Sequence, residues 1–203
     1  MTEKEKMQRQ MLYDANYDED LIRERASAKD LCYEYNQLRP SDTEGRTKLM
    51  KKLLGKTKGA FEIVAPFWCD YGYNIEVGEN FFANYNLTVL DVGPVRIGDN
   101  AQIAPNVSIY TAGHPVHPDS RNSGYEYGIG ITIGDNVWIG GNACILPGVT
   151  IGSNVVIGAG SVVTHDLPDN VIAAGNPCRV VRQITEADRD FYFKDRRFDV
   201  EDY

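Results

Sequence analysis

The sequence predicts a mainly β fold, a parallel β-helix of hexapeptide repeats that follows a helical N-terminal segment. The first observation is a column of Ile and Val residues spaced six apart, at positions 133, 139, 145, 151, 157 and 163. A period of six fits three-residue strands joined by tight corners, and neither an α-helix nor one long strand. The second is alternation: Val137 and Ile139 would face inward, with Trp138 between them facing outward. The third is the corner residues, such as Gly134-Asp135-Asn136, which tolerate a sharp turn.

Residues 1–58 are predicted to form a helical segment. Residues 3–14 suit a short amphipathic helix, and residues 18–38 suit a second helix capped by Asp18. The pattern Ser41-x-x-Glu44 is a capping box that predicts the start of a third helix. A segment of about 55 residues makes a weak core by itself, so we expect it to pack on the β-helix.

Residues 59–184 are predicted to form the β-helix, the catalytic domain, with an irregular stretch over residues 81–94. The region before Ile131 is rich in Pro, Gly and polar residues that cannot continue the core columns. It therefore predicts a loop ejected at about residues 115–130, and loops of this length are uncommon unless functional. Residues 185–203 are predicted to form a short helix, capped by Thr185, and a charged tail that frays or packs on the surface.

Composition excludes several classes of function. The formal net charge of −8 argues against a surface that binds the phosphate backbone of nucleic acids. The start of the chain has no apolar signal region, and no run approaches the length of a membrane span. The four cysteines, far apart and without a C-x-x-C pair, favour reduced thiols and a cytoplasmic protein.

His114 is the leading catalytic candidate. In the phase of the preceding repeats it occupies an outward mid-strand position, where the long loop departs. A neutral imidazole there can take a proton from an alcohol, which is the work of a general base. Two alternatives are a solvated or loop-fixing histidine, and a zinc site shared by His114, His117 and His165, as in enzymes resembling carbonic anhydrases.

Other side chains suggest binding sites. Trp138 faces outward, which suits a subunit interface or a ligand wall. Arg179 and Arg182 form a small basic site suited to phosphate, although a solvated pair is also common. Several polar groups could hold an acceptor with many hydroxyls: Asp14, Asp18, Asp70, Asn84, Asp91 and Glu126. The regular repeat would look the same in a non-catalytic β-helix scaffold, which stays an alternative.

Longer motifs carry a resemblance to a known family. They are MLYDA (11–15), YEYNQLRP (33–40), LDVGPVRIGDN (90–100), IYTAGHPVHP (109–118), RNSGYEYG (121–128) and ITIGDNVWIGGNACILPGVTIG (131–152). With these motifs the chain resembles the maltose/galactoside O-acetyltransferases, which are hexapeptide-repeat acyltransferases, and is closer to the maltose branch. The resemblance implies a left-handed β-helix, a homotrimer with active sites between subunits, and acetyl-CoA as co-substrate, with no metal required for catalysis.

The resemblance also implies roles for individual residues. His114 would be the base that activates a sugar hydroxyl for direct attack on the thioester, aided by Asn84. Asp14, Asp70 and Asn84 fall where the family contacts its acceptor, expected here to be maltose-like or glucose-like. The positions where the family contacts coenzyme A are Trp138, Gly141, Ala159, Thr164, His165, Arg179 and Arg182. Two departures are Asp70, where the galactoside branch has a small hydroxyl residue, and His165, where lysine is usual.

Overall fold

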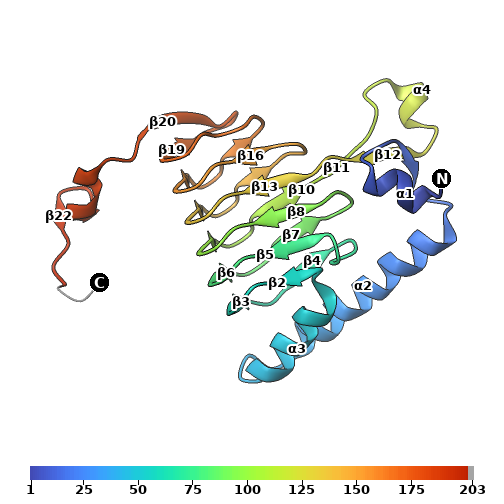
Figure 1. Cartoon of the computed structure of the whole chain (residues 1–203), viewed down its shortest axis with the longest axis horizontal. Helices are drawn as coiled ribbons and strands as arrows, with labels where there is room; N and C mark the ends of the chain where they lie inside the picture. Colours follow the sequence, from blue (N-terminus) through green and yellow to red (C-terminus); the bar gives the residue numbers. More distant parts are fainter. Residues whose placement is uncertain (201–203) are drawn as a thin grey trace.

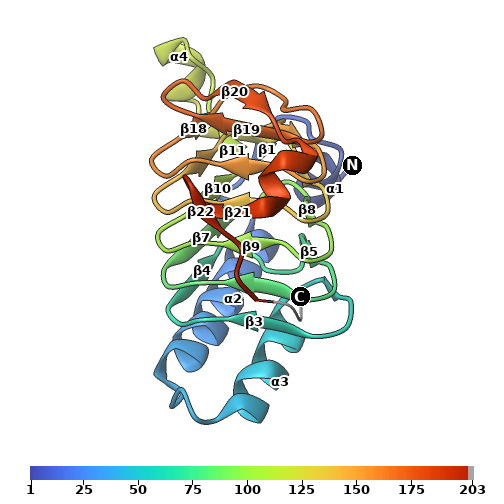
Figure 2. The same ribbon diagram turned by 90° about the vertical axis from the view of Figure 1, so that its left-hand side faces the viewer.

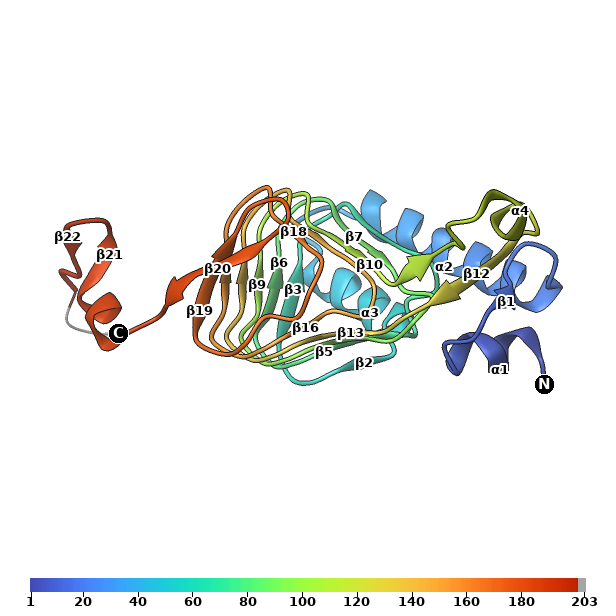
Figure 3. The same cartoon turned by 90° about the horizontal axis from the view of Figure 1, so that it is seen from above.

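Parallel strands stack into the three walls of a triangular coil in the computed structural model, which describes residues 1–200 (Figures 1 and 3). The coils wind as a left-handed parallel β-helix, as expected. Wall 1 contains β4 (Phe67–Cys69), β7 (Leu87–Leu90), β10 (Ser108–Tyr110), β15 (Cys144–Ile145) and β18 (Val162–Val163). Wall 2 contains β2 (Lys56–Thr57), β5 (Ile75–Val77), β8 (Val95–Ile97), β13 (Ile131–Ile133) and β16 (Thr150–Ile151). Wall 3 contains β3 (Phe61–Ile63), β6 (Phe81–Ala83), β9 (Gln102–Ile103), β14 (Trp138–Ile139), β17 (Val156–Ile157), β19 (Val171–Ala174) and β20 (Arg179–Gln183).

The six-residue columns form the core, as the periodicity predicts. Ile133, Ile139, Ile145 and Ile151 are each at most 2% exposed, whereas Trp138 on the outer face is 54% exposed. Burial of these aliphatic columns is the main stabilising contribution of the coil, at roughly 25 cal/mol per Å² of apolar surface.

The corner between walls 2 and 3 is an asparagine ladder. Its five members have φ between 55° and 59°, and the amide nitrogen of each of the first four donates to the amide oxygen of the asparagine in the next coil at 2.8–3.1 Å. Asparagine tolerates this left-handed backbone and also pairs with itself from coil to coil. The ladder consists of Asn80, Asn100, Asn136, Asn154 and Asn170.

Extra residues leave the coil at a single corner, between walls 1 and 2, which we call the insertion corner. Strand partners are eighteen positions apart in the upper coils, as for Thr132 and Thr150. They are twenty apart in the lower coils, as for Glu76 and Arg96, because two more residues follow β4 and β7. The long loop departs from the same corner after β10. The two-residue insertions of the lower coils and the long loop therefore stack along the same corner, with the loop above the insertions.

The N-terminal segment contains α1 (Glu3–Gln8), β1 (Tyr13–Asp14), α2 (Glu19–Gln37) and α3 (Thr43–Leu53). In this segment, α2 and α3 cover the lower end of the coil, and α1 lies beside the long loop (Figure 1). Asp18 caps α2 as predicted, by accepting from the Leu21 N–H at 2.9 Å. The first helix is shorter than predicted because the chain turns into β1. The predicted Ser41 cap is wrong: the carboxylate of Asp42 caps α3 by accepting from the Gly45 N–H.

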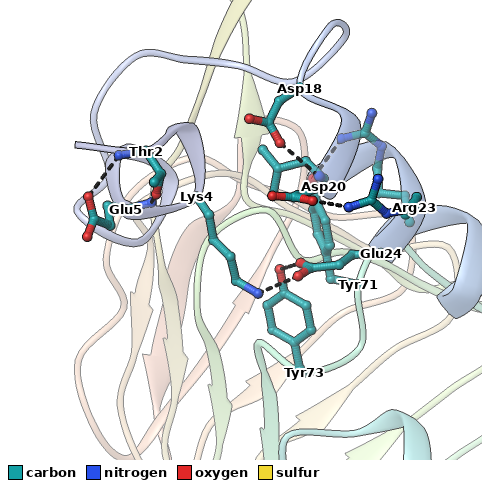
Figure 4. Close-up of polar contacts among 11 residues, drawn as sticks. Thr2, Lys4, Glu5, Asp18, Asp20, Arg23, Glu24, Tyr71 and Tyr73 are labelled. Carbon is teal, nitrogen blue, oxygen red and sulfur yellow. Dashed lines mark hydrogen bonds and ion pairs between the residues drawn. The ribbon is translucent and has the colours of Figure 1, made fainter.

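Polar contacts fasten these helices to the insertion corner (Figure 4). Lys4 on α1 donates to Glu24 on α2 at 2.5 Å, and Tyr73, in the insertion after β4, donates to the other Glu24 oxygen at 2.7 Å. The N-terminal segment thereby reaches the same edge of the coil from which the long loop emerges.

The predicted loop is more structured than the sequence indicates. It contains β11 (Ala112–Gly113), α4 (Pro118–Arg121) and β12 (Tyr125–Gly128). Strand β12 pairs antiparallel with β11 on one side and with β1 on the other, which makes a three-stranded sheet. This loop sheet joins the N-terminal segment to the loop.

A C-terminal arm follows β20. It contains a 3-10 helix, η1 (Glu186–Asp190), and a hairpin of β21 (Phe191–Phe193) and β22 (Arg196–Arg197), and it stands away from the coil (Figures 1 and 2). The short helix is as predicted, but the tail pairs into a hairpin instead of fraying. Residues 201–203 of the predicted tail lie outside the described residues. None of the helices found in residues 1–200 has the length and apolar character needed to span a bilayer.

Candidate functional site

His114 lies at the end of β11, beside the loop sheet and not on a wall of the coil, which corrects the predicted mid-strand position. The chain leaves wall 1 at Thr111, whose N–H donates to the Leu90 carbonyl oxygen and whose own carbonyl accepts from Ile129. His114 directly follows β11, and its side chain is about half exposed (52%). The imidazole is therefore held near the coil yet open to a ligand.

Glu126 on β12 is the side chain that faces this histidine. Its Oε2 atom lies 4.0 Å from Nε2 of His114, and its Oε1 atom accepts a hydrogen bond from the Tyr13 hydroxyl. Tyr13 and Glu126 are direct partners across the β1–β12 pair. Burial, together with the Glu126 carboxylate, raises the pKa of Tyr13, so this hydroxyl remains a donor.

Two aspartates lie at the insertion corner below the loop. Burial raises the pKa of Asp70, and the negative charge of Glu126 raises it further. Oδ1 of the fully buried Asp91 accepts from the N–H groups of Asp70 and Tyr71, at 3.0 and 2.9 Å. Its Oδ2 has no hydrogen-bond partner within residues 1–200, and burial raises the pKa of Asp91 to about 6. Asp91 therefore fixes the backbone that presents Asp70.

Asp14 approaches the loop from the N-terminal segment. Its Oδ1 atom accepts from the N–H groups of Asn16 and Tyr17, both at 3.0 Å, and the Asn16 amide donates to the Gly124 carbonyl oxygen. Asp14 is also the β1 partner of Tyr125. The loop sheet thus brings residues that are more than a hundred positions apart in the sequence to one edge of the coil.

A second group of predicted residues follows wall 3 and the corner between walls 3 and 1. Trp138 projects from β14, and Gly141 lies at that corner, where its carbonyl oxygen accepts from the Gly160 N–H. Ala159 precedes Gly160 at the same corner, and Asn84 lies there in a lower coil. The Asn84 side chain accepts from the Tyr85 N–H at 2.8 Å.

The predicted phosphate-binding residues lie at the upper end of the coil. Arg182 makes a two-pronged ion pair with Asp188 at 2.7 and 2.8 Å, and Arg179 donates to the Cys178 carbonyl oxygen. Thr164 Oγ1 lies 2.7 Å from Nδ1 of His165. An open hollow of about 340 Å³ connects two of the predicted positions, and its lining consists of His165, Asp166, Leu167, Cys178, Arg179 and Val180.

The chain is similar to known proteins in both sequence and structure. A family described as "Maltose acetyltransferase hexapeptide capping motif" matches residues 6–59, and one described as "Bacterial transferase hexapeptide (six repeats)" matches residues 130–165. The chain is 49% identical to the galactoside O-acetyltransferase of Escherichia coli, over 87% of each protein. A maltose O-acetyltransferase structure from Clostridium difficile is 54% identical with a TM-score of 0.90, and covers 92% of this chain and 99% of its own. The chain belongs to the maltose/galactoside O-acetyltransferase family.

A solved structure of a galactoside acetyltransferase contains coenzyme A. The protein in that structure is 46% identical to this chain, with a TM-score of 0.94 over 98% of this chain and 100% of its own. In the present member of the maltose/galactoside O-acetyltransferase family, the predicted residues form two separate groups in one chain. Asn84 precedes the wall-1 strand β7, whereas the loop that carries His114 follows the wall-1 strand β10. The two residues thus lie at opposite edges of wall 1.

The metal alternative finds no geometric support in residues 1–200, where no three His, Cys, Asp or Glu side chains are grouped so that they could hold a metal ion. His165 follows β18, two wall-1 strands above β10, and His117 caps α4 by accepting from the Asp119 N–H.

Tyr13 is the residue of this candidate site that sequence reasoning missed. A tyrosine between two helices carries no pattern of its own. Its partner Glu126 lies 113 positions away, so only the pairing of β1 with β12 reveals the contact.

Proposed function

We propose that the protein transfers the acetyl group of acetyl-CoA to a hydroxyl of a sugar or glycoside, with a maltose-like or glucose-like acceptor. The observation that carries the proposal is the half-exposed His114 imidazole facing the Glu126 carboxylate at the insertion corner. The family membership of the chain and the coenzyme A bound by a relative of 46% identity support the choice of donor.

The reaction is a direct transfer within a ternary complex. His114 takes the proton of the acceptor hydroxyl as its oxygen attacks the thioester carbonyl carbon. The resulting tetrahedral species expels the coenzyme A thiolate, which receives the proton. General-base catalysis contributes about 10²–10⁴-fold, and the alignment of two bound substrates contributes further. Asn84 assists the base in this proposal.

The acceptor binds at the insertion corner. Carboxylates accept hydrogen bonds from sugar hydroxyls, and Asp14, Asp70 and Glu126 supply them from three separate elements. Because Asp70 and Glu126 are both acidic, this pocket differs in charge from one that has a small hydroxyl residue at position 70. We propose that this difference favours maltose-like over galactoside acceptors.

Coenzyme A binds along wall 3 and the upper coils. Trp138 and the glycine-containing corner form one side of this surface, and Arg179, Arg182 and the neighbouring Thr164 and His165 approach the phosphates. At the corner, Gly141 has no side chain and Ala159 has only a methyl group, so these two positions leave room for a narrow ligand.

We further propose a homotrimer in the cytoplasm, with each active site between two subunits. Two observations support the assembly. The base and acceptor group lies at a different corner from Asn84 and Trp138, so a second copy is needed to join them. The C-terminal arm also exposes aromatic side chains, with Tyr192 55% and Phe193 56% exposed, and a short hairpin has little stability by itself.

Replacement of His114 tests the mechanism. His114→Ala should lower kcat at least a hundredfold and leave the affinity for coenzyme A, measured by calorimetry, unchanged. His117→Ala is the matched control, because His117 lies on the same loop with an exposed side chain. Unchanged turnover in His114→Ala would contradict the mechanism.

Two further measurements separate the alternatives. Release of coenzyme A across a panel of maltose, glucose and galactosides, compared by kcat/KM, identifies the acceptor. Stoichiometric zinc in the purified protein would instead favour the zinc enzyme, and failure to bind acetyl-CoA saturably would favour a non-catalytic scaffold.

A further inference from the structure

The Tyr13 ring is rigidly held next to the proposed base. It is fully buried, and it belongs to a small apolar cluster separate from the core of the coil. The cluster consists of Met7, Tyr13, Ala15, Leu21, Tyr71 and Val92. Strand β1, which carries Tyr13, is also held by its antiparallel backbone pairing with β12. The position of the Tyr13 hydroxyl is therefore fixed by both side-chain and backbone contacts.

The Tyr13 hydroxyl donates to only one of the two carboxylate oxygens of Glu126. The Glu126 side chain is 15% exposed, and its second oxygen faces Nε2 of His114 at 4.0 Å. Within residues 1–200, no lysine or arginine forms an ion pair with Glu126. The Arg25 guanidinium, which interacts electrostatically with Glu126, donates hydrogen bonds to the Tyr71 hydroxyl and the Ala15 carbonyl oxygen. A mostly buried carboxylate thus faces the histidine, and among residues 1–200 no lysine or arginine is ion-paired with it.

We infer that Tyr13 is a positioning residue for catalysis: its hydroxyl orients Glu126 so that the free carboxylate oxygen stabilises the imidazolium of His114. The inference rests on the proposed function, in which His114 becomes positively charged as it takes the acceptor proton. Oriented negative charge at the point where positive charge develops lowers the barrier of that step, because no reorganisation is needed when the proton moves. Tyr13 itself touches neither substrate and acts only through Glu126.

The inference gives the N-terminal segment a second task. Its helices α2 and α3 cover the end of the coil (Figure 1), and α1 is tied to α2 and the insertion corner through Lys4, Glu24 and Tyr73 (Figure 4). These contacts also hold β1 in register with β12, so the segment builds part of the site. A segment that only covered the end of the coil would not need a tyrosine hydroxyl at position 13.

A double-mutant cycle measures whether Tyr13 acts through Glu126. Tyr13→Phe keeps the ring and removes the hydroxyl, whereas Glu126→Gln keeps an oxygen for Tyr13 and removes the charge. We expect each to lower kcat on the order of tenfold, with KM for acetyl-CoA unchanged, and the double variant to be no slower than Glu126→Gln. Independent, multiplicative losses would overturn the inference. A rise in acceptor KM at constant kcat would overturn it too, since Glu126 would then act only in acceptor binding.

Controls separate a structural effect from a positioning effect. Tyr35→Phe removes the hydroxyl of an equally buried tyrosine that donates to the Ile63 carbonyl oxygen, far from the loop, and should leave kcat unchanged. If Tyr13→Phe fails to fold, Glu126→Gln alone decides: a lower kcat supports the inference, whether or not the acceptor KM also rises through the lost acceptor contact, and an unchanged kcat refutes it. An active His114→Ala variant would refute the proposed function, whereas an inactive one combined with independent losses in the cycle would refute only this inference.

Discussion

The buried Asp91 makes stability depend on pH in a direction opposite to that of most carboxylates. Burial raises its pKa from 3.8 to about 6, against the opposing hydrogen bonds from the N–H groups of Tyr71 and Asp70. Between these two values the folded protein holds more protons at this site than the unfolded chain does. The free energy of unfolding therefore falls as pH rises from about 4 to about 6, and it stays at the lower value above this range.

The size of the effect follows from the same two pKa values. A change of one in pKa corresponds to about 1.4 kcal/mol, and part of the effect is already present at pH 4, so ionisation of Asp91 should lower the free energy of unfolding by about 2.5 kcal/mol between pH 4 and pH 7. Asp91→Asn retains a side-chain oxygen for the two N–H groups and cannot ionise. The stability of this variant relative to the parent protein should therefore increase by about 2.5 kcal/mol over the same pH range.

Urea unfolding followed by circular dichroism at a series of pH values measures this difference. Protein concentration must be constant, because assembly contributes to apparent stability. Asp119→Asn, which removes an exposed carboxylate from the loop helix α4, controls for the change in net charge. If the curves of Asp91→Asn and the parent protein run parallel from pH 4 to pH 7, the buried carboxylate does not ionise as the structure indicates, and the reasoning fails.

Three further predictions address the ladder, the arm and the donor site. Asn136→Ala loses two amide hydrogen bonds and places alanine, which disfavours left-handed backbone, at φ 56°, so the free energy of unfolding should fall by about 2–4 kcal/mol. Asn136→Gly loses the same hydrogen bonds without the backbone strain, so its free energy of unfolding, measured with urea, should fall by about 1 kcal/mol less. Equal losses in the two variants would exclude a contribution of backbone strain. Deletion of residues 185–203 should shift the protein to smaller species in sedimentation velocity, whereas an unchanged assembly would contradict a role of the arm. Arg182→Ala should raise KM for acetyl-CoA several-fold, and Asp188→Asn, which frees the guanidinium, should lower it; no change in either variant would remove Arg182 from the donor site.

Local and periodic features could be predicted from the sequence because each depends on neighbours in the chain. The helix cap at Asp18 is such a feature, and the asparagine corners are another. The Ser41 cap was mispredicted because Asp42, one residue later, offers a carboxylate to the same helix end. His114 was found by its place at the end of the repeat, but its phase was wrong because the chain leaves the coil at Thr111.

By itself, the sequence determined the coil: Ile and Val every six residues can be buried only if three-residue strands stack with tight corners between them. Only the tertiary structure decided where the side chains of the site meet. Insertions of different length open at one corner because the wall ladders must continue unbroken, so extra residues can leave only where a strand ends. Tyr13 and Glu126, 113 positions apart, meet through the β1–β12 pair, and no local pattern encodes such a long-range partner.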